Sequence, residues 1–402
     1  MQYWDALFAF LVAMAVATAL TPLTGRLARR VGAVVRPSER GLAERETPAL
    51  GGVAILAGVL VASALWLPST ISLHHTLGTA PGTGGTVHTW TILVGACVIT
   101  LVGAIDDAHP LAPQWKLLGQ IAAAVIAVAG GAVVTDVTIP FIGTLQLPNT
   151  GGVLTVIWLV GLMNVVNLSD GVDGLAAGLC TIVGVAFAII AFDLHVSGAG
   201  VLSALTAGAA LGFLFHNFYP ASSLMGDAGA NLLGYLLGVV AVVGSVKTGA
   251  VVTLVAPLIV LAVPFLDTGF VVAKRLKYKR KPWSADANHF HHRMARLGFS
   301  PRRTVAYLYG WTLLLAAVAV ALRFVPYSNH HGTYYLGWVL VMVAIALIAL
   351  AASVYLIYVL EILKFKSRRV RELRDAAPDS SEDEIEVQVQ REVETGEFER
   401  VG

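Results

Sequence analysis

Charge is scarce in this chain of 402 residues. Only 13% of the residues are Asp, Glu, Lys or Arg, whereas 56% are hydrophobic, and the mean hydropathy is +0.75. Soluble domains carry about 25% charged residues, and a charge interrupts their apolar segments every turn or two. The shortage of charge therefore excludes a large soluble core.

Cysteine is also scarce, since the chain holds only Cys97 and Cys180. Both lie inside apolar runs, where an unpaired cysteine behaves as a small hydrophobic residue. The pair indicates neither a disulfide framework nor a cysteine-based metal site.

The apolar residues come in runs of about 17 to 25, the length that spans a bilayer as a helix. We therefore predict an all-α polytopic membrane protein with about eleven transmembrane helices. Residues 1–365 form the membrane domain, and residues 366–402 form a charged cytoplasmic tail that we expect to be disordered. The expected spans are 3–23, 50–67, 90–105, 118–134, 152–168, 174–194, 200–217, 229–246, 250–273, 303–324 and 335–363.

Positive charge is distributed unevenly between alternate loops. Of the 27 Lys and Arg residues, 25 fall in one set of loops and the tail, and only Lys247 and Arg323 do not. Basic loops stay in the cytoplasm, so this distribution predicts an external N-terminus and a cytoplasmic C-terminus. Among the external loops, residues 137–147 alternate in polarity around Gly143, which predicts a small β-hairpin.

Acidic residues flank several spans at the predicted cytoplasmic face. Asp106 and Asp107 end the third span, and Asp227 follows Gly226 at the start of the eighth. Carboxylates at membrane depth are costly and mark a site by default, although a helix-ending pair and a simple N-cap are the plainer alternatives. Lys116 either approaches the same pocket or extends to the interface from the next helix.

The most specific string lies between the fifth and sixth spans. Asn164, Asn167, Asp170 and Asp173 recur every third residue, which places them along one side of a helix end and the following turn. Such a row can hold a hard cation or hydrogen-bond a nucleotide. A helix cap needs only one such residue.

Basic and imidazole groups occupy two further cytoplasmic loops. His289, His291, His292 and Arg293 follow Asp286 in the most basic loop, where an anionic ligand such as a diphosphate suits them better than another cation. Arg45 precedes the second span and is a candidate phosphate contact.

Together these motifs resemble those of the polyprenyl-phosphate N-acetylhexosamine-1-phosphate transferases, a family of the glycosyltransferase 4 type. The His-x-His-His string resembles the bacterial polyprenyl-phosphate GlcNAc-1-phosphate transferase branch. The resemblance covers residues 1 to about 365 and rests on Asp106-Asp107, Asn164-x-x-Asn167-x-x-Asp170-Gly-x-Asp173-Gly-Leu, Met225-Gly226-Asp227-x-Gly229 and His289-x-His291-His292-Arg293.

The resemblance implies a reaction in the bacterial inner membrane with the active site on the cytoplasmic face. GlcNAc-1-phosphate passes from UDP-GlcNAc to a membrane polyprenyl phosphate, which initiates cell-envelope polysaccharide synthesis. It also implies Mg2+ as cofactor, with Mn2+ as a substitute, and a homodimer; no nucleic-acid partner is expected.

Carried over by position, the resemblance assigns Asp227 and Asn167 to the metal. It assigns catalysis to Asp106, Asp107, Asp170 and Asp173, and substrate binding to Arg45, Lys116, Asn164, Asp173, His289, His291, His292 and Arg293. Leu224, where relatives often have an aromatic residue, and Glu46, where this branch often has a histidine, depart from the pattern.

Two alternatives remain open from the sequence. One is a phospho-MurNAc-pentapeptide transferase, which uses a different UDP-sugar. The other is a secondary transporter, since intramembrane Asp and His also mark transport pathways, but transporters place such groups near the midplane.

Overall fold

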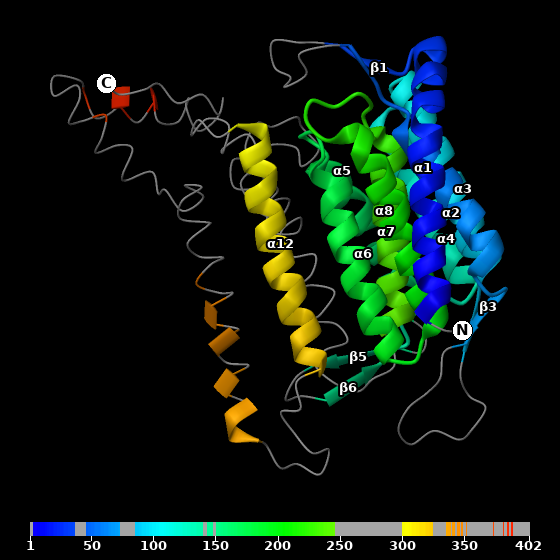
Figure 1. Cartoon of the computed structure of the whole chain (residues 1–402), viewed down its shortest axis with the longest axis vertical. Coiled ribbons are helices and arrows are strands. Elements are labelled where there is room, and N and C mark those ends of the chain that lie inside the picture. Colours follow the sequence, from blue (N-terminus) through cyan, green and yellow to red (C-terminus); the bar gives the residue numbers. More distant parts are fainter. Residues whose placement is uncertain are drawn as a thin grey trace.

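The computed structural model describes residues 3–36, 46–72, 85–139, 143–147, 150–245 and 300–324, with single residues between 335 and 388. The described residues form a bundle of long helices (Figure 1). These helices are α1 Tyr3–Val31, α2 Gly51–Trp66, α3 Thr89–Ala108, α4 Pro113–Ala129, α5 Gly151–Ser169, α6 Leu175–Asp193, α7 Ser197–Asn217, α8 Gly226–Ser245 and α12 Pro301–Phe324.

Each of these helices coincides with a predicted span, and two differ clearly from it, α1 in length and α4 in position. α1 continues past residue 23 to Val31, before Gly32 adopts a φ of 83°. α4 begins earlier than predicted, with Pro113 in its first turn, and ends at Ala129 instead of residue 134. The Gly130-Gly131 pair ends it because Gly131 has a φ of 98°, which breaks a right-handed helix.

Seven of the described helices are long and apolar enough to cross a membrane: α1, α3, α5, α6, α7, α8 and α12. The all-helical polytopic membrane class is thereby confirmed. The predicted span 250–273 lies outside the described residues, as do most of span 335–363 and of the tail 366–402.

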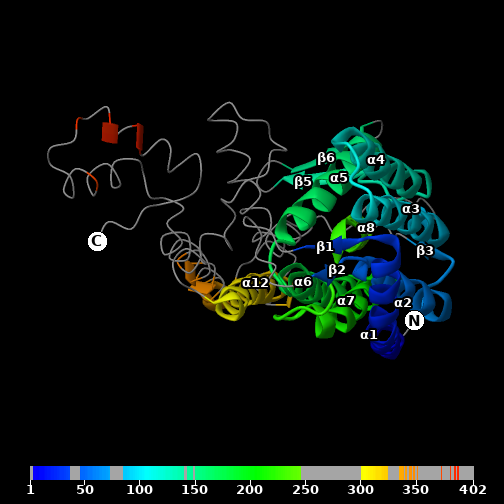
Figure 2. The ribbon, with the colours of Figure 1, turned by 90° about the horizontal axis from the view of Figure 1, so that it is seen from above.

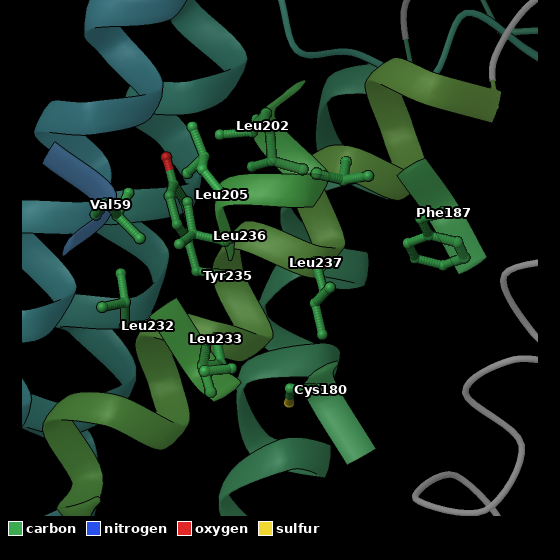
Figure 3. Packing of buried hydrophobic residues seen from close by; sticks show 14 of the residues in the cluster. Val59, Cys180, Phe187, Leu202, Leu205, Leu232, Leu233, Tyr235, Leu236 and Leu237 are labelled. Atoms are coloured by element: carbon green, nitrogen blue, oxygen red, sulfur yellow. The ribbon is translucent and has the colours of Figure 1, made fainter. Parts of the chain in front are cut away.

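α8 occupies the interior of the bundle. It packs against α3 and α5 on one side and against α2, α6 and α7 on the other, an arrangement visible from above in Figure 2. Figure 3 shows Leu232, Leu233, Leu236 and Leu237 of α8 meeting neighbouring apolar side chains, and all four are fully buried. α8 is therefore the most enclosed helix of the described bundle, and its N-terminal end carries Asp227.

Small residues allow α1 and α7 to pack closely. A Cβ on Gly208 or Gly212 of α7 would collide with the carbonyl oxygens of Phe10 or Met14 on α1, so glycine is required for this approach.

Pro22 lies inside α1 and cannot donate to the carbonyl of Thr18, four residues earlier. The His216 ring of α7 lies 3.0 Å from that carbonyl and donates the missing hydrogen bond. The proline is thus accommodated by the neighbouring helix.

Three two-stranded antiparallel ladders join helix ends. β1 Val34–Val35 pairs with β2 Thr47–Pro48, and β3 Thr70–Ser72 pairs with β4 Thr86–His88. β5 Asp136–Ile139 pairs with β6 Gly143–Gln146, with Val137 opposite Leu145, which confirms the hairpin predicted near 137–147. In Figure 1, β1 lies at one end of the bundle, and β3, β5 and β6 lie at the other.

Candidate active site

The predicted acidic residues converge at the end of the bundle that carries β1. Here the C-terminal ends of α3, α5 and α7 meet the N-terminal ends of α4, α6 and α8 (Figure 1). Side-chain contacts here join residues more than one hundred positions apart, such as Lys116 with Asp227. The sequence prediction that these motifs form one site is therefore supported for the members that the structure describes.

Asp107, which lies in α3, caps the N-terminus of α8. Its Oδ1 accepts a hydrogen bond from the backbone N–H of Asp227 at 2.8 Å, and its Oδ2 accepts one from Ala228 at 3.1 Å. The first N–H groups of a helix have no partner within the helix, and a carboxylate there also complements the positive end of the helix dipole. Asp107, and not Asp227, is thus the cap of α8.

Lys116 lies between two carboxylates. Its ammonium is 2.9 Å from Oδ2 of Asp227 and forms a still closer ion pair with Oδ2 of Asp106. Asp106 is buried, with 6% of its side chain exposed, and its Oδ1 accepts a hydrogen bond from the Leu111 backbone at 2.7 Å. Lys116 therefore lies with the acidic residues and does not extend away from them to the membrane interface.

Asp170 directly follows Ser169, the last residue of α5, and Asp173 lies in the turn between α5 and α6. Asp173 accepts a hydrogen bond from the backbone N–H of Ala221 at 2.9 Å, which ties this turn to the loop before α8. Burial, followed by the charges of Asp227, Asp107 and Asp173, raises the pKa of Asp170 to about 8. The four carboxylates are therefore close enough to repel one another.

Three amide side chains extend this polar site into the bundle. Asn164 of α5 donates to Gln120 of α4 at 2.8 Å, and Gln120 donates to Asn231 of α8 at 2.9 Å. Asn231 in turn donates to the backbone carbonyl of Asp227 at 2.8 Å.

The sequence analysis missed Gln120 and Asn231. Each is a buried amide within an apolar run, four residues after Lys116 or Asp227. Helical spacing of four places both members of each pair on one face, and this signal could have found them.

The loop before α8 is held against the start of α2. Gly51 and Gly52 donate to the carbonyls of Leu224 and Met225, each at 3.0 Å, and Leu224 donates to Pro48 at 2.8 Å. Glu46, nearby in sequence, forms an exposed ion pair with Arg36 at 3.1 Å.

Several predicted site residues cannot be placed in this geometry. Arg45, His289, His291, His292 and Arg293 lie outside the described residues. Asn167 lies in the last turn of α5 and is half-buried.

Oxygen donors suited to Mg2+ are present at this site. Within the described ranges, no three His, Cys, Asp or Glu residues form a complete metal-binding group. Mg2+ needs few protein ligands, because it keeps several waters and is held by one or two carboxylates together with substrate phosphates. The carboxylates that raise the pKa of Asp170 form an excess of negative charge, which a divalent cation would relieve, so the residues fit the ion.

Fold and site together define a polytopic membrane protein with a carboxylate-rich polar site at one end of its helical bundle. Residues 89–245 match the family model "Glycosyl transferase family 4", and this range contains every described member of the site.

Full-length relatives agree with the family match. The chain is 33% identical to a probable undecaprenyl-phosphate N-acetylglucosaminyl 1-phosphate transferase of Bacillus subtilis, over 78% of this chain and 84% of the relative. It is 35% identical to a decaprenyl-phosphate N-acetylglucosaminephosphotransferase of Mycobacterium leprae (76% and 80%), and 36% identical to the enzyme of that name from Mycolicibacterium smegmatis (74% and 77%). The chain belongs to the polyprenyl-phosphate N-acetylglucosamine-1-phosphate transferases of glycosyl transferase family 4.

Proposed function

We propose that this protein transfers GlcNAc-1-phosphate from UDP-GlcNAc to a membrane polyprenyl phosphate, forming polyprenyl-diphosphate-GlcNAc and UMP. The observation that carries the proposal is the convergence of Asp106, Asp107, Asp170, Asp173 and Asp227 at one end of the bundle, where Lys116 pairs with Asp106 and Asp227. The names of the relatives support the choice of lipid and sugar.

The reaction joins two anions, so like-charge repulsion is its main barrier. An oxygen of the lipid phosphate attacks the sugar-linked phosphorus of UDP-GlcNAc. A new P–O bond forms to the lipid phosphate, and the bond to the bridging oxygen breaks, so that UMP leaves with that oxygen. Catalysis of such a transfer consists mostly of alignment and charge stabilisation.

Lys116 supplies positive charge at the point where α3, α4 and α8 meet. We assign it to the phosphate groups, together with the predicted contacts Arg45, Asn164, His289, His291, His292 and Arg293. Asp227 and Asn167 would hold Mg2+, which supplies charge neutralisation to the phosphates when bound. Asp170 and Asp173 serve the nucleotide and the site.

A general base is not required, because a phosphate is already ionised near pH 7. Asp106 and Asp107 are each candidates for a base, a nucleophile in a two-step route, or an electrostatic positioner. The two backbone hydrogen bonds of Asp107 favour positioning for that residue, since both its oxygens are occupied. Release of UMP from UDP-GlcNAc without lipid acceptor would instead support a covalent route.

The proposed placement in the membrane follows from charge. We propose eleven spans, an external N-terminus, and a cytoplasmic C-terminus and active site, because 25 of the 27 basic residues lie in the loops and tail assigned to that face. A homodimer is proposed from the family resemblance.

The decisive experiment supplies purified protein with polyprenyl phosphate and either UDP-GlcNAc or UDP-MurNAc-pentapeptide, with and without Mg2+. We expect Mg2+-dependent UMP release and a GlcNAc-linked lipid product only with UDP-GlcNAc. Turnover of the pentapeptide substrate alone would identify the other branch, and no turnover of either would reject the transferase.

A further inference from the structure

Two contacts between α4 and α8 form a ladder one helical turn deep. Lys116 and Gln120 are four residues apart on α4, and Asp227 and Asn231 are four residues apart on α8, so each pair shares a helix face. Lys116 meets Asp227 at 2.9 Å, and Gln120 meets Asn231 at 2.9 Å. The charged rung belongs to the site, and the amide rung lies one turn deeper in the bundle.

The amide rung is well enclosed and fully engaged. Gln120 is 4% exposed and Asn231 is 5% exposed. Beyond their mutual bond, Gln120 accepts from Asn164 at 2.8 Å, and Asn231 donates to the Asp227 carbonyl at 2.8 Å. A buried amide is costly when a partner is lost, so these bonds restrict both side chains to one arrangement.

Helix packing by itself does little to align α4 with α8. α4 packs mainly on α3 and α5, and only lightly on α8. The side-chain bonds of the ladder therefore set the register between the two helices. The branch to Asn164 ties the same rung to α5, which carries Asp170 at its end.

We propose that Gln120 and Asn231 are positioning residues that fix Lys116 and Asp227 at the separation needed for phosphoryl transfer. The proposal rests on the proposed function for its effect on turnover, and not for the geometry itself. Neither residue touches the reacting atoms; both act through Lys116 and the first turn of α8.

The first experiment is a double-mutant cycle in reconstituted protein. Gln120→Leu and Asn231→Leu should each lower kcat on the order of tenfold to a hundredfold, as small misplacements at a site do, with the KM for UDP-GlcNAc changed less than about twofold. In a Lys116→Met background the same substitutions should lower kcat by a factor at least about threefold smaller, because one of the two groups that they position is already absent.

A purely structural role gives a different result. In that case each substitution would cost the same factor with Lys116 or Met at position 116, and the proposal would be overturned. Thr206→Val is the matched control, since Thr206 is fully buried in α7 and, among the described residues, its hydroxyl donates to Leu202 of the same helix. The proposal also fails if Gln120→Leu lowers kcat no more than this control.

Conservative exchange gives a second check. Gln120→Asn combined with Asn231→Gln retains one amide pair of the same total length, so kcat should return to within about threefold of the unmodified protein, more than either single change allows. Failure of the pair to exceed both singles would count against the ladder.

Hydrogen exchange of residues 226–232 provides a readout without turnover. Both leucine variants should exchange at least about fivefold faster there, whereas Thr206→Val should not. Faster exchange in a protein inactive toward UDP-GlcNAc would reject the proposed function but support the ladder. Unchanged exchange would overturn the ladder whether or not the protein is active.

Discussion

Lys116 places a positive charge between two carboxylates of the site. Its ammonium contacts Asp106 and Asp227 at once, while Asp107 lies against the start of the same helix as Asp227. A positive charge among several carboxylates lowers their mutual repulsion. It also lies where two phosphorylated reactants would need a cation, so its loss should affect catalysis more than folding.

We expect Lys116→Met to lower kcat about a hundredfold or more, comparable to removing a group that stabilises transition-state charge. UMP release at saturating UDP-GlcNAc measures it. Arg29→Met removes an exposed cation near the end of α1 and should leave kcat within about twofold. Wild-type turnover in Lys116→Met would remove this residue from the mechanism.

Asp170 makes the stability of the metal-free protein dependent on pH. Its pKa is about 8 in the folded protein against an ordinary value of 3.8, so the folded state binds a proton that the unfolded state releases. Stability should therefore fall as pH rises from about 4 to about 8.

Asp170→Asn removes this penalty. Thermal unfolding in detergent with a chelator should show the variant gaining on the unmodified protein between pH 5 and pH 8.5. An equal difference in midpoint at both pH values would contradict the assignment.

At the scale of elements, α8 is placed by its neighbours. Asp107 of α3 caps it, the start of α2 binds the loop before it, and Gly226 opens it with a φ of 69°. A Cβ at Gly226 would collide with Asp107 and with the Ala49 carbonyl. The position of Asp227 thus depends on close approach by the Asp107 side chain of α3 and by the backbone just before α2.

Gly103 tests this approach. A Cβ there would lie 2.5 Å from the Cα and N atoms of Ala228, which are backbone and cannot move aside easily. We expect Gly103→Ala to destabilise the protein by about 2 kcal/mol or more and to lower kcat, measured by thermal unfolding and UMP release.

Gly161→Ala is the matched control, because a Cβ at Gly161 in α5 meets nothing within 4 Å. It should be neutral or slightly stabilising, since alanine favours helix. Equal effects of the two substitutions would show that close packing of α3 against α8 does not matter.

At the scale of the molecule, successive helices from α1 to α8 run in opposite directions, so the loops between them collect alternately at opposite ends (Figure 1). The end with the carboxylates is the one that the basic loops assign to the cytoplasm. Orientation therefore decides which compartment supplies the soluble nucleotide.

Single-cysteine labelling tests the orientation. After replacement of Cys97 and Cys180, Ala112→Cys reports the loop before α4, and Thr150→Cys reports the opposite end before α5; both positions are exposed. An impermeant thiol reagent applied to intact cells should label position 150 and not position 112, and lysis should make position 112 reactive. The reverse pattern would place the site outside the cell.

The span positions in the described part of the chain follow from the sequence because a bilayer demands long, uninterrupted apolar segments. The predicted helix ends were less accurate than the predicted spans. Gly130 and Gly131, for example, end α4 before its apolar run ends. The acidic candidates could be chosen because charge at membrane depth is rare. Gln120 and Asn231 were harder to choose, because an uncharged amide in an apolar run does not stand out; only their spacing of four from Lys116 and Asp227 points to them.

By itself, then, the sequence determined the class of protein, the spans in the described part of the chain and the residue types available for chemistry, since these depend on local composition and spacing. Only the tertiary structure decided which atoms meet: Lys116 with Asp106 and Asp227, Asp107 with the start of α8, and Gln120 with Asn231. Such contacts join positions up to 121 residues apart. They depend on how closely helices approach, which small residues and neighbouring backbone set jointly.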